Sequence, residues 1–560
     1  MRGDTFLSYS IGVDFGTESG RVLLLDLVSG QEMASSVIPY SNGVIDAVLP
    51  NTGERLPPDW ALQDPLDYIQ VLEIGIPSVL EQVKVSADAV IGIGIDFTSC
   101  TVLPVNEAGV PLCATDNWSH HPHSWPKLWK HHAAQHYADV INEMAIKNDE
   151  TFISRYGGKI SSEWYFPKLL EIFQDDREVY DATYAFIEAT DWVVWYLTGK
   201  LMKNSCTAGY KALWSENGGY PSKEFFTGID SEFVNPFEKL GEIFFPLGTR
   251  AGYVREDLAI KLGLTSHTAV AVGNVDAHVS VPGAGVSEAG SLVMVMGTSI
   301  CHLTVNQKEI FLPGITGVVK NGILPDLFGY EAGQAAVGDM FAWFVNQSVP
   351  QEYFDTAKNN QQTIYELLES FASNINPGAT GLMALDWWNG NRSILGDANL
   401  SGLIAGITLA SRPEEIYRSL LESTAFGTRI IIENFIKNGV FIHKLVACGG
   451  ISIKSSLLMQ IYADVCGLPV HVMNSTEIPA RGSALFGAVA AGRSAGGFIS
   501  IEEASVTLAP PIYKIYIPIP SHKIIYDQLF KIYKRLYEYF GSSEADLMHE
   551  LKEIRIENLR

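Results

Sequence analysis

Two short glycine-containing turns, far apart in the chain, combine small residues with hydroxyl side chains. The first is DFGTESGR, residues 14–21, and the second is Gly297-Thr298-Ser299. A turn that approaches a phosphate closely needs glycine, because a side chain would block the backbone N–H groups. Ordinary hairpin turns would look the same, but two opposed turns could grip one polyphosphate from both sides.

Four side chains of the first turn could take part in phosphate chemistry. Thr17 and Ser19 supply hydroxyl donors, and Arg21 supplies a guanidinium that pairs well with phosphate. Asp14, at the end of a buried strand, could hold Mg²⁺ directly or through water. The turn therefore predicts a phosphate and metal site.

A further carboxylate, Asp276, follows an apolar strand in the segment VGNVDAH, residues 272–278. Phosphoryl transfer to an alcohol needs a carboxylate that orients the hydroxyl and accepts its proton. Asp276 fits this role, although it could also cap the next helix.

A pair of glycines, Gly449 and Gly450, follows Cys448. They would let a base or phosphate pack on the backbone, or would simply make a tight turn.

Other common sites for nucleotides or metals are missing or weak. The chain has no G-x-x-x-x-G-K-[ST] motif and no complete G-x-G-x-x-G motif. Residues 117–136 hold six of the 13 histidines, with His132 and His136 one turn apart. No cysteine or carboxylate has a ligand-like spacing with them, so we predict that this segment carries no structural metal. Its mixture of aromatic and polar groups suits a sugar.

The elements that position these residues recur along the chain. Residues 9–27 and 290–305 both indicate strand, turn and strand, which predicts two β-hairpins. Residues 86–97 indicate a buried strand, and residues 443–467 a strand, a Gly-Gly turn and a helix. A repeat separated by half the chain favours two domains of related design, with a boundary near residues 284–290.

Helical patterns occupy other parts of the chain. Helices are predicted in 164–173 and 190–199, the second ending at Gly199, and an amphipathic helix is predicted in 526–540. Leu457, Leu458, Ile461 and Val465 share one face of the helix after the Gly-Gly turn.

The composition restricts the class of protein. With 560 residues and 47% apolar residues, the chain can form two large packed domains. A net charge of -24 disfavours nucleic acid and anionic membranes as partners, although backbone N–H groups and a metal ion can still hold a nucleotide. The six cysteines form no C-x-x-C pair, and we find neither a long apolar run nor an apolar signal core. These features predict a cytoplasmic protein with free thiols.

The segments DFGTESGR, GNVDAH, MGTS and ACGGIS, in this order, resemble the FGGY family of carbohydrate kinases. The resemblance covers about residues 9 to 540. It implies an α/β fold of two ribonuclease H-like domains, as in actin, hexokinase and the heat-shock ATPases, around a central cleft. Residues 1–287 would hold the sugar, the first phosphate hairpin and the catalytic aspartate, and residues 288–560 would hold ATP.

Longer segments are most similar to the family members that phosphorylate ribulose. They are DFTSCTVLP, LWKHHAAQ, YGGKISSEWYFPK, ATDWVVWYLTG, GYKALW, GNVDAHVSVPGAG and YEAGQAAVGDMFAWF. The resemblance implies transfer of phosphate from ATP, with Mg²⁺, to L-ribulose and also D-ribulose, in the breakdown of L-arabinose. A homodimer is compatible with it. The alternatives are a kinase of another ketose or polyol, of the xylulose, ribitol or glycerol type, and, more distantly, an actin-like or chaperone-like ATPase.

The resemblance also implies roles for single residues. Asp276 matches the catalytic base and Asp14 the carboxylate linked to the metal. One departure is Ser99, where the commoner form of the segment is DFTACT. The residues implied in sugar binding are Ser99 through its backbone, Trp129, Lys211, Asp276 and Glu331. Those implied in phosphate and adenosine binding are Thr17, Ser19, Arg21, Gly297, Thr298, Gly338, Gly449, Gly450 and Lys454.

Overall fold

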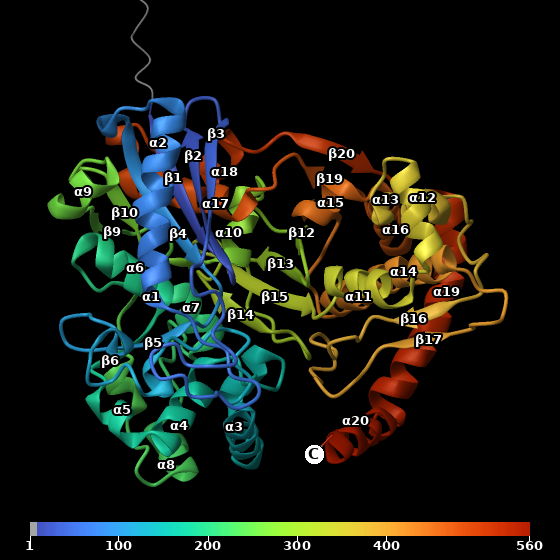
Figure 1. Cartoon of the computed structure of the whole chain (residues 1–560), viewed down its shortest axis with the longest axis horizontal. Helices are drawn as coiled ribbons and strands as arrows, with labels where there is room; N and C mark the ends of the chain where they lie inside the picture. The colour runs from blue at the N-terminus through green and yellow to red at the C-terminus, as the bar shows by residue number, and fades with distance from the viewer. Residues whose placement is uncertain (1–7, 560) are drawn as a thin grey trace, which may run out of the picture.

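Two mixed β-sheets lie at the centres of the two halves of the molecule (Figure 1). The structure is a computed structural model that describes residues 8–559. The first sheet has the order β3-β2-β1-β4-β10-β9, with β11 paired to β4. Its strands are β1 (Tyr9–Phe15), β2 (Ser19–Asp26), β3 (Glu32–Pro39), β4 (Val90–Phe97), β9 (Arg250–Tyr253), β10 (Ala269–Ala271) and β11 (Asn274–Val275).

The second sheet has the order β14-β15-β13-β12-β18-β19-β20. Its strands are β12 (Ser291–Met296), β13 (Ile300–Asn306), β14 (Gly317–Lys320), β15 (Phe328–Gln334), β18 (Lys444–Cys448), β19 (Val470–Met473) and β20 (Ile512–Tyr516). The central strands β1, β4, β12 and β18 are almost entirely buried, which explains their continuous apolar sequences.

Both sheets repeat one topology. β1 pairs with β2 antiparallel and with β4 parallel, while β12 pairs with β13 antiparallel and with β18 parallel. The two Gly-Thr turns therefore occupy equivalent places, one between β1 and β2 and the other between β12 and β13. This confirms the prediction of two α/β domains of related design and the two predicted hairpins.

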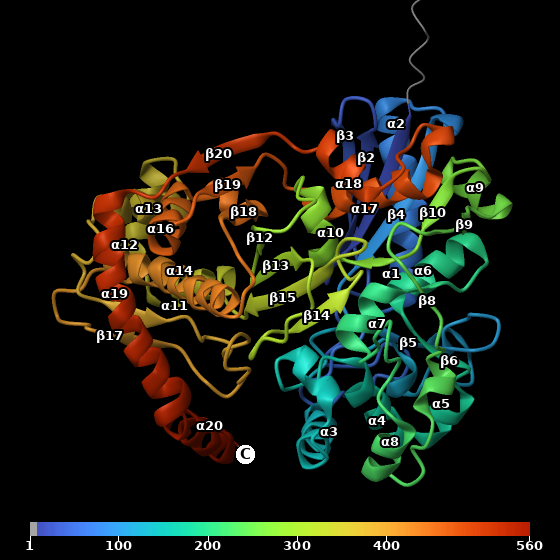
Figure 2. The same cartoon turned by 180° about the vertical axis from the view of Figure 1, so that it is seen from behind.

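Residues 102–247 form a helical layer below the first sheet (Figure 2). The layer contains α3 (Gln135–Lys147), α4 (Tyr165–Asp175), α5 (Arg177–Ala182), α7 (Ser205–Lys211) and α8 (Lys223–Ile229), with the short strands β5 (Val102–Val105), β6 (Ala185–Glu188), β7 (Lys203–Asn204) and β8 (Phe244–Phe245). Helix α6 (Ala189–Thr198) falls within this range of residues but packs on the first sheet, against β4, β9 and β10. Helices α4 and α6 confirm two predictions, and α6 ends where Gly199 takes the left-handed conformation, with φ of 72°.

The remaining helices flank the two sheets. Near the first sheet lie α1 (Pro65–Gln70), α2 (Ile76–Val83), α9 (Glu256–Leu262) and α10 (Asp276–Gly283). The second half contains α11 (Gly338–Ser348), α12 (Gln351–Asn359), α13 (Ile364–Ser373), α14 (Pro413–Lys437), α15 (Gly450–Lys454), α16 (Ser456–Cys466), α19 (Pro520–Glu538) and α20 (Asp546–Leu559), with the strands β16 (Met383–Leu385) and β17 (Leu403–Ala405). Helix α19 confirms the predicted amphipathic helix. On α16, Leu458, Ile461 and Val465 are buried and Leu457 is half-buried, as predicted.

Helices α17 (Ile478–Ala491) and α18 (Ile501–Thr507) return from the second half of the chain to the first sheet, where they lie beside its blue strands in Figure 1. A Cβ atom at Gly12, Gly92 or Gly94 would lie only 1.7–2.1 Å from a backbone oxygen of α17. Glycine is therefore required on β1 and β4, because the backbones of helix and sheet are in direct contact.

Helix α17 also presses on α10. A Cβ atom at Gly482 would lie 2.0 Å from the backbone oxygen of Val279, and one at Gly283 would lie 2.4 Å from that of Ile478. The stretch 284–290 lies between α10 and β12. A division of the chain at residue 287 stays a proposal, in which α17 and α18 reach across to the first sheet.

All six cysteines are free thiols in the structure, as predicted. Cys301 and Cys466 are half-buried, and the other four are buried. None of the helices within residues 8–559 combines the length and the apolar character needed to cross a membrane.

Replacing Gly94 by alanine should destabilise the protein strongly, because the new Cβ would lie 1.8 Å from the backbone oxygen of Ser483 and would push α17 off the sheet. We expect a loss of about 1–3 kcal/mol or more in the free energy of unfolding, measured by urea denaturation. Gly228→Ala on α8 is the matched control, since its Cβ would meet only Met144 at 3.8 Å. Equal stability of the two variants would contradict the contact.

Candidate active site

Three carboxylates meet where the central strands of the first sheet end. Asp14 lies near the end of β1 and Asp96 near the end of β4, and the two are direct neighbours in the parallel register. Asn274 pairs with Asp96 from the other side, and the chain then turns into α10, whose first residue is Asp276. The carboxyl ends of parallel strands thus bring together side chains that are up to 262 positions apart.

Asp96 is a site residue that the sequence analysis missed. The available signal was the Asp-Phe pair that ends both buried strands, in IGVDF and in IGIDF. Ser483 on α17 donates a hydrogen bond of 2.5 Å to Asp96 Oδ2. Burial, and then the charge of Asp14, raise the pKa of Asp96 well above its ordinary value. This favours a protonated Asp96 that can donate to Asp14.

The other two carboxyls are also hard to ionise. Burial raises the pKa of Asp14, and the guanidinium of Arg21, 3.3 Å from Asp14 Oδ2, partly offsets this. Burial, and then the charge of Asp14, raise the pKa of Asp276 to about 7. The carboxylates are crowded and short of positive charge, which suits a site that receives a cation.

A buried ion pair joins the two halves of the molecule next to Asp276. Lys211 Nζ, at the end of α7, lies 3.3 and 3.4 Å from the carboxylate oxygens of Glu331 on β15. His278 Nε2 lies 3.4 Å from Glu331 Oε2. Burial by itself would raise the pKa of Glu331, but Lys211 and then His278 hold it below its usual range. Glu331 therefore stays ionised, whereas the pKa of Asp276 is close to neutral pH.

Besides the two ring nitrogens of His278, two more polar atoms near this pair have no hydrogen-bond partner in the described part of the chain. They are Ser99 Oγ, in the loop after β4, and Trp164 Nε1, whose ring lies 5.5 Å from Lys211 Nζ. Buried polar groups normally have partners, so these atoms are candidates for contact with a polar ligand. Trp164 and His278 were missed as site residues, although both lie in segments that carry the family resemblance.

Hydrogen bonds connect the first hairpin turn to the aromatic segment that is expected at the sugar. Trp129 Nε1 donates to Thr17 Oγ1 at 3.1 Å, and Gln63 donates to the backbone oxygen of Thr17. Ser19 opens β2 beside this turn. Arg21, in contrast, already contacts two carboxylates. Its Nη1 donates to Asp14 Oδ2, and its Nε lies 2.9 Å from Glu477 Oε2. Both contacts use part of the guanidinium, which has five N–H donors in all.

The glycines of the second half converge on the other hairpin. The N–H of Gly338 donates to Gly297 O, and the N–H of Val337 donates to the backbone oxygen of Thr298. A Cβ atom at Gly338 would lie 2.7 Å from Gly297 O, and one at Gly449, where φ is 96°, would lie 2.3 Å from Met296 O. Gly450 faces open space. These glycines leave a bare backbone cradle of the kind that a nucleotide needs.

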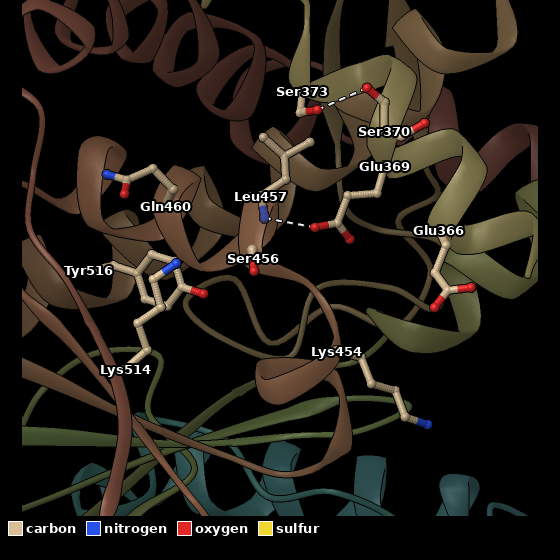
Figure 3. A pocket seen from close by; sticks show the side chains of 10 residues that line it. All are labelled: Glu366, Glu369, Ser370, Ser373, Lys454, Ser456, Leu457, Gln460, Lys514 and Tyr516. Atoms are coloured by element: carbon tan, nitrogen blue, oxygen red, sulfur yellow. Dashed lines mark hydrogen bonds between the residues drawn. The ribbon is translucent and has the colours of Figure 1, made fainter. Parts of the chain in front are cut away.

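Lys454 lies at the end of α15, at the margin of a cavity of about 460 Å³ (Figure 3). Its side chain extends away from Leu457, whose N–H donates to Glu369. None of the three carboxylates lines this cavity. The lining residues are Glu366, Glu369, Ser370, Ser373, Lys454, Ser456, Leu457, Gln460, Lys514 and Tyr516.

Three of the six histidines of residues 117–136 make side-chain hydrogen bonds within the protein. His131 bonds to Glu171 at 3.0 Å, His121 to Asp176 at 2.8 Å, and His132 to Ser162 at 3.4 Å. Within residues 8–559 there is no group of three His, Cys, Asp or Glu side chains that could hold a metal ion by itself. That the segment carries no structural metal stays a prediction.

Comparison with known proteins points to one family. Models of the N-terminal and C-terminal domains of the FGGY family of carbohydrate kinases match residues 9–283 and 292–491. A ribulokinase of Anoxybacillus flavithermus is 53% identical and covers 97% of this chain and 96% of its own. A ribulokinase of Staphylococcus aureus is 40% identical, with 98% and 100% covered.

Solved structures show the same fold. A xylulose kinase from Lactobacillus acidophilus has a TM-score of 0.78 at 18% identity and covers 96% of this chain and 100% of its own. A Plasmodium falciparum glycerol kinase with ADP has a TM-score of 0.74 at 16% identity, with 94% and 98% covered. This chain belongs to the FGGY family of carbohydrate kinases.

Proposed function

We propose that this chain transfers the γ-phosphoryl group of ATP to the terminal hydroxyl of L-ribulose, and also of D-ribulose, giving ribulose 5-phosphate and ADP. The observation that carries the proposal is the place of Asp276, at the start of α10 beside Asp14, Glu331 and Lys211. Burial, and then the charge of Asp14, raise the pKa of this carboxyl to about 7. Such a group accepts and releases a proton readily at neutral pH. The ribulokinases that are 53% identical over nearly the whole chain support ribulose as the acceptor.

Asp276 orients the hydroxyl and accepts its proton as the hydroxyl oxygen bonds to the γ-phosphorus. The bond from the γ-phosphorus to the bridging oxygen breaks at the same centre, and ADP leaves with that electron pair. Lys211 donates to sugar hydroxyls and Glu331 accepts from them. The backbone of Ser99 and the ring of Trp129 complete the sugar pocket.

The two hairpins hold the triphosphate from opposite sides. Thr17, Ser19 and Thr298 donate hydroxyl groups, and the turn at Gly297 lets the phosphates approach the backbone. Gly338, Gly449, Gly450 and Lys454 lie on the adenosine side. Kinases of this family use ATP, typically with a divalent metal. We assign Mg²⁺ to Asp14, where the ion would offset charge on the phosphates.

The acceptor is tested directly by a coupled assay of ADP release. We expect rapid release with L-ribulose and D-ribulose, and slow release with xylulose, ribitol, glycerol or no sugar. Fast release with one of the other sugars would support a kinase of that ketose or polyol. ATP hydrolysis that does not need any sugar would support the actin-like ATPase instead.

Replacing Asp276 by asparagine should lower kcat by about 10²–10⁴-fold, because the amide keeps the shape but cannot accept the proton. ATP affinity should change little. Asp88→Asn, at an exposed carboxylate in the short 3-10 helix Ala87–Ala89, is the matched control. A kcat within a few-fold of wild type would remove Asp276 from the role of base.

The same variant has a second readout in stability. The pKa of Asp276 is about 7 in the folded protein and near 3.8 when unfolded, so ionisation disfavours the folded wild type. This cost is absent at low pH, grows as the pH rises from about 4 to about 7, and is constant above. We therefore compare the unfolding temperatures of Asp276→Asn and wild type at each pH. The unfolding temperature of the variant minus that of wild type should increase between about pH 4 and about pH 7. A difference that does not change with pH would contradict the raised pKa.

Replacing Glu331 by glutamine should raise the KM for ribulose by about 10-fold or more, because a charge-assisted hydrogen bond contributes about 1.5–3 kcal/mol. The KM for ATP should stay nearly constant. The alternative is that Lys211 and Glu331 form only a structural ion pair. In that case the variant would unfold at a lower temperature and keep the wild-type KM for ribulose.

A further inference from the structure

Lys168, in the second turn of α4, is a fully buried cation that binds only backbone oxygens. Its Nζ donates to Cys100 O at 2.7 Å, to Leu128 O at 2.9 Å and to Lys127 O at 3.3 Å. In the part of the chain that the structure describes, it makes no salt bridge. Three donors thus meet three carbonyl groups, which is the full capacity of an ammonium group.

The three carbonyl groups belong to two different loops. The first loop follows β4 and contains Ser99 and Cys100, and Cys100 takes a left-handed φ of 60°, which is uncommon for any residue other than glycine. Such a conformation persists when surrounding contacts hold it in place. The bond from Lys168 to Cys100 O is one contact of this kind, and the bond from Thr98 N to Phe15 O is another.

The second loop leads from Lys127 to Trp129. Trp129 Nε1 donates to Thr17 Oγ1, so this loop sets the aromatic ring against the first phosphate hairpin. The two loops also pair with each other, since Val102 and Lys127 exchange backbone hydrogen bonds. The ammonium of Lys168 lies at their junction and binds both of them.

Two other buried lysines are bonded differently. Lys127 Nζ lies 3.0 Å from Glu171 Oε2, so its charge is balanced by a carboxylate. Lys203 donates to a single backbone oxygen, that of Leu240. Burial of a charge is costly unless the group is paired or fully hydrogen-bonded. An apolar side chain would fill the site of Lys168 at lower cost, but it could not hold three loop carbonyls in one arrangement.

We infer that Lys168 is the positioning residue of the sugar pocket, holding the Ser99 loop and the Trp129 loop in the spacing that ribulose requires. This inference rests on the proposed function. Lys168 does not reach the substrate itself and acts through the backbone of Cys100 and Leu128.

The test is steady-state kinetics of Lys168→Met in the full-length protein. Methionine keeps the length of the side chain and removes all three donors. We expect the KM for ribulose to rise by about 10-fold or more, with kcat and the KM for ATP changed by less than about 3-fold. Lys203→Met is the matched control, and it should lose stability without a change in either KM.

Failure of this inference is distinguishable from failure of the proposed function. Wild-type protein that releases no ADP with any ribulose refutes the proposed function, whatever Lys168 does. Active wild-type protein together with an unchanged KM for ribulose in Lys168→Met overturns the positioning role. Lys168→Gln, which keeps two donors, should show a smaller rise in KM and replaces the methionine variant if that variant does not fold.

Hydrogen exchange of the wild-type protein gives a readout that needs no variant. Saturating ribulose should slow exchange of the amides in residues 98–101 and 127–129, because the sugar closes on both loops at once. Protection of only one loop, or of neither, would show that Lys168 does not couple them for sugar binding.

Discussion

Direct contact between the backbone of α17 and the first sheet is the constraint on which the active site depends. Gly12, Gly92 and Gly94 bring β1 and β4 against this helix, and these strands end at Asp14 and Asp96. Gly482 brings the same helix against α10, which begins at Asp276. One helix from the second half of the chain thereby sets the spacing of three carboxylates from the first half.

The environment divides the carboxyls of the site into different roles. Asp276 has carboxylates as its near neighbours, and burial raises its pKa to about 7, where it can exchange a proton. Glu331 faces Lys211 and His278, which keep it ionised and able to accept hydrogen bonds. In the mechanism that we propose, the same chemical group thus serves as base in one place and as a binding group in the other, because the neighbouring charges differ.

The sugar pocket that we propose is built on loops, and loops need support from a rigid scaffold. Here the support comes from the helical layer, where buried charged groups on α4 face the loops. Glu171 pairs with Lys127 and His131, while Lys168 binds the loop backbone itself. The cost of burying these charges is offset by hydrogen bonds that fix loop geometry to within the tolerance that substrate binding demands.

The sequence by itself determined the fold class, both hairpins, the main helices and the candidacy of Asp14 and Asp276. These features are local, since an apolar run indicates a buried strand and a glycine-hydroxyl turn indicates a close approach of a ligand to the backbone.

Other features could not be identified from the sequence. They are the place of Asp96 in the site, the contacts of Arg21 with Asp14 and Glu477, and the packing of α17 on the first sheet. The sequence allowed an ion pair of Lys211 and Glu331 as an alternative, and their contact across 120 positions is seen in the structure. Only the tertiary structure decided these features, because contacts between distant residues depend on how whole elements pack, and no short stretch of sequence encodes that packing.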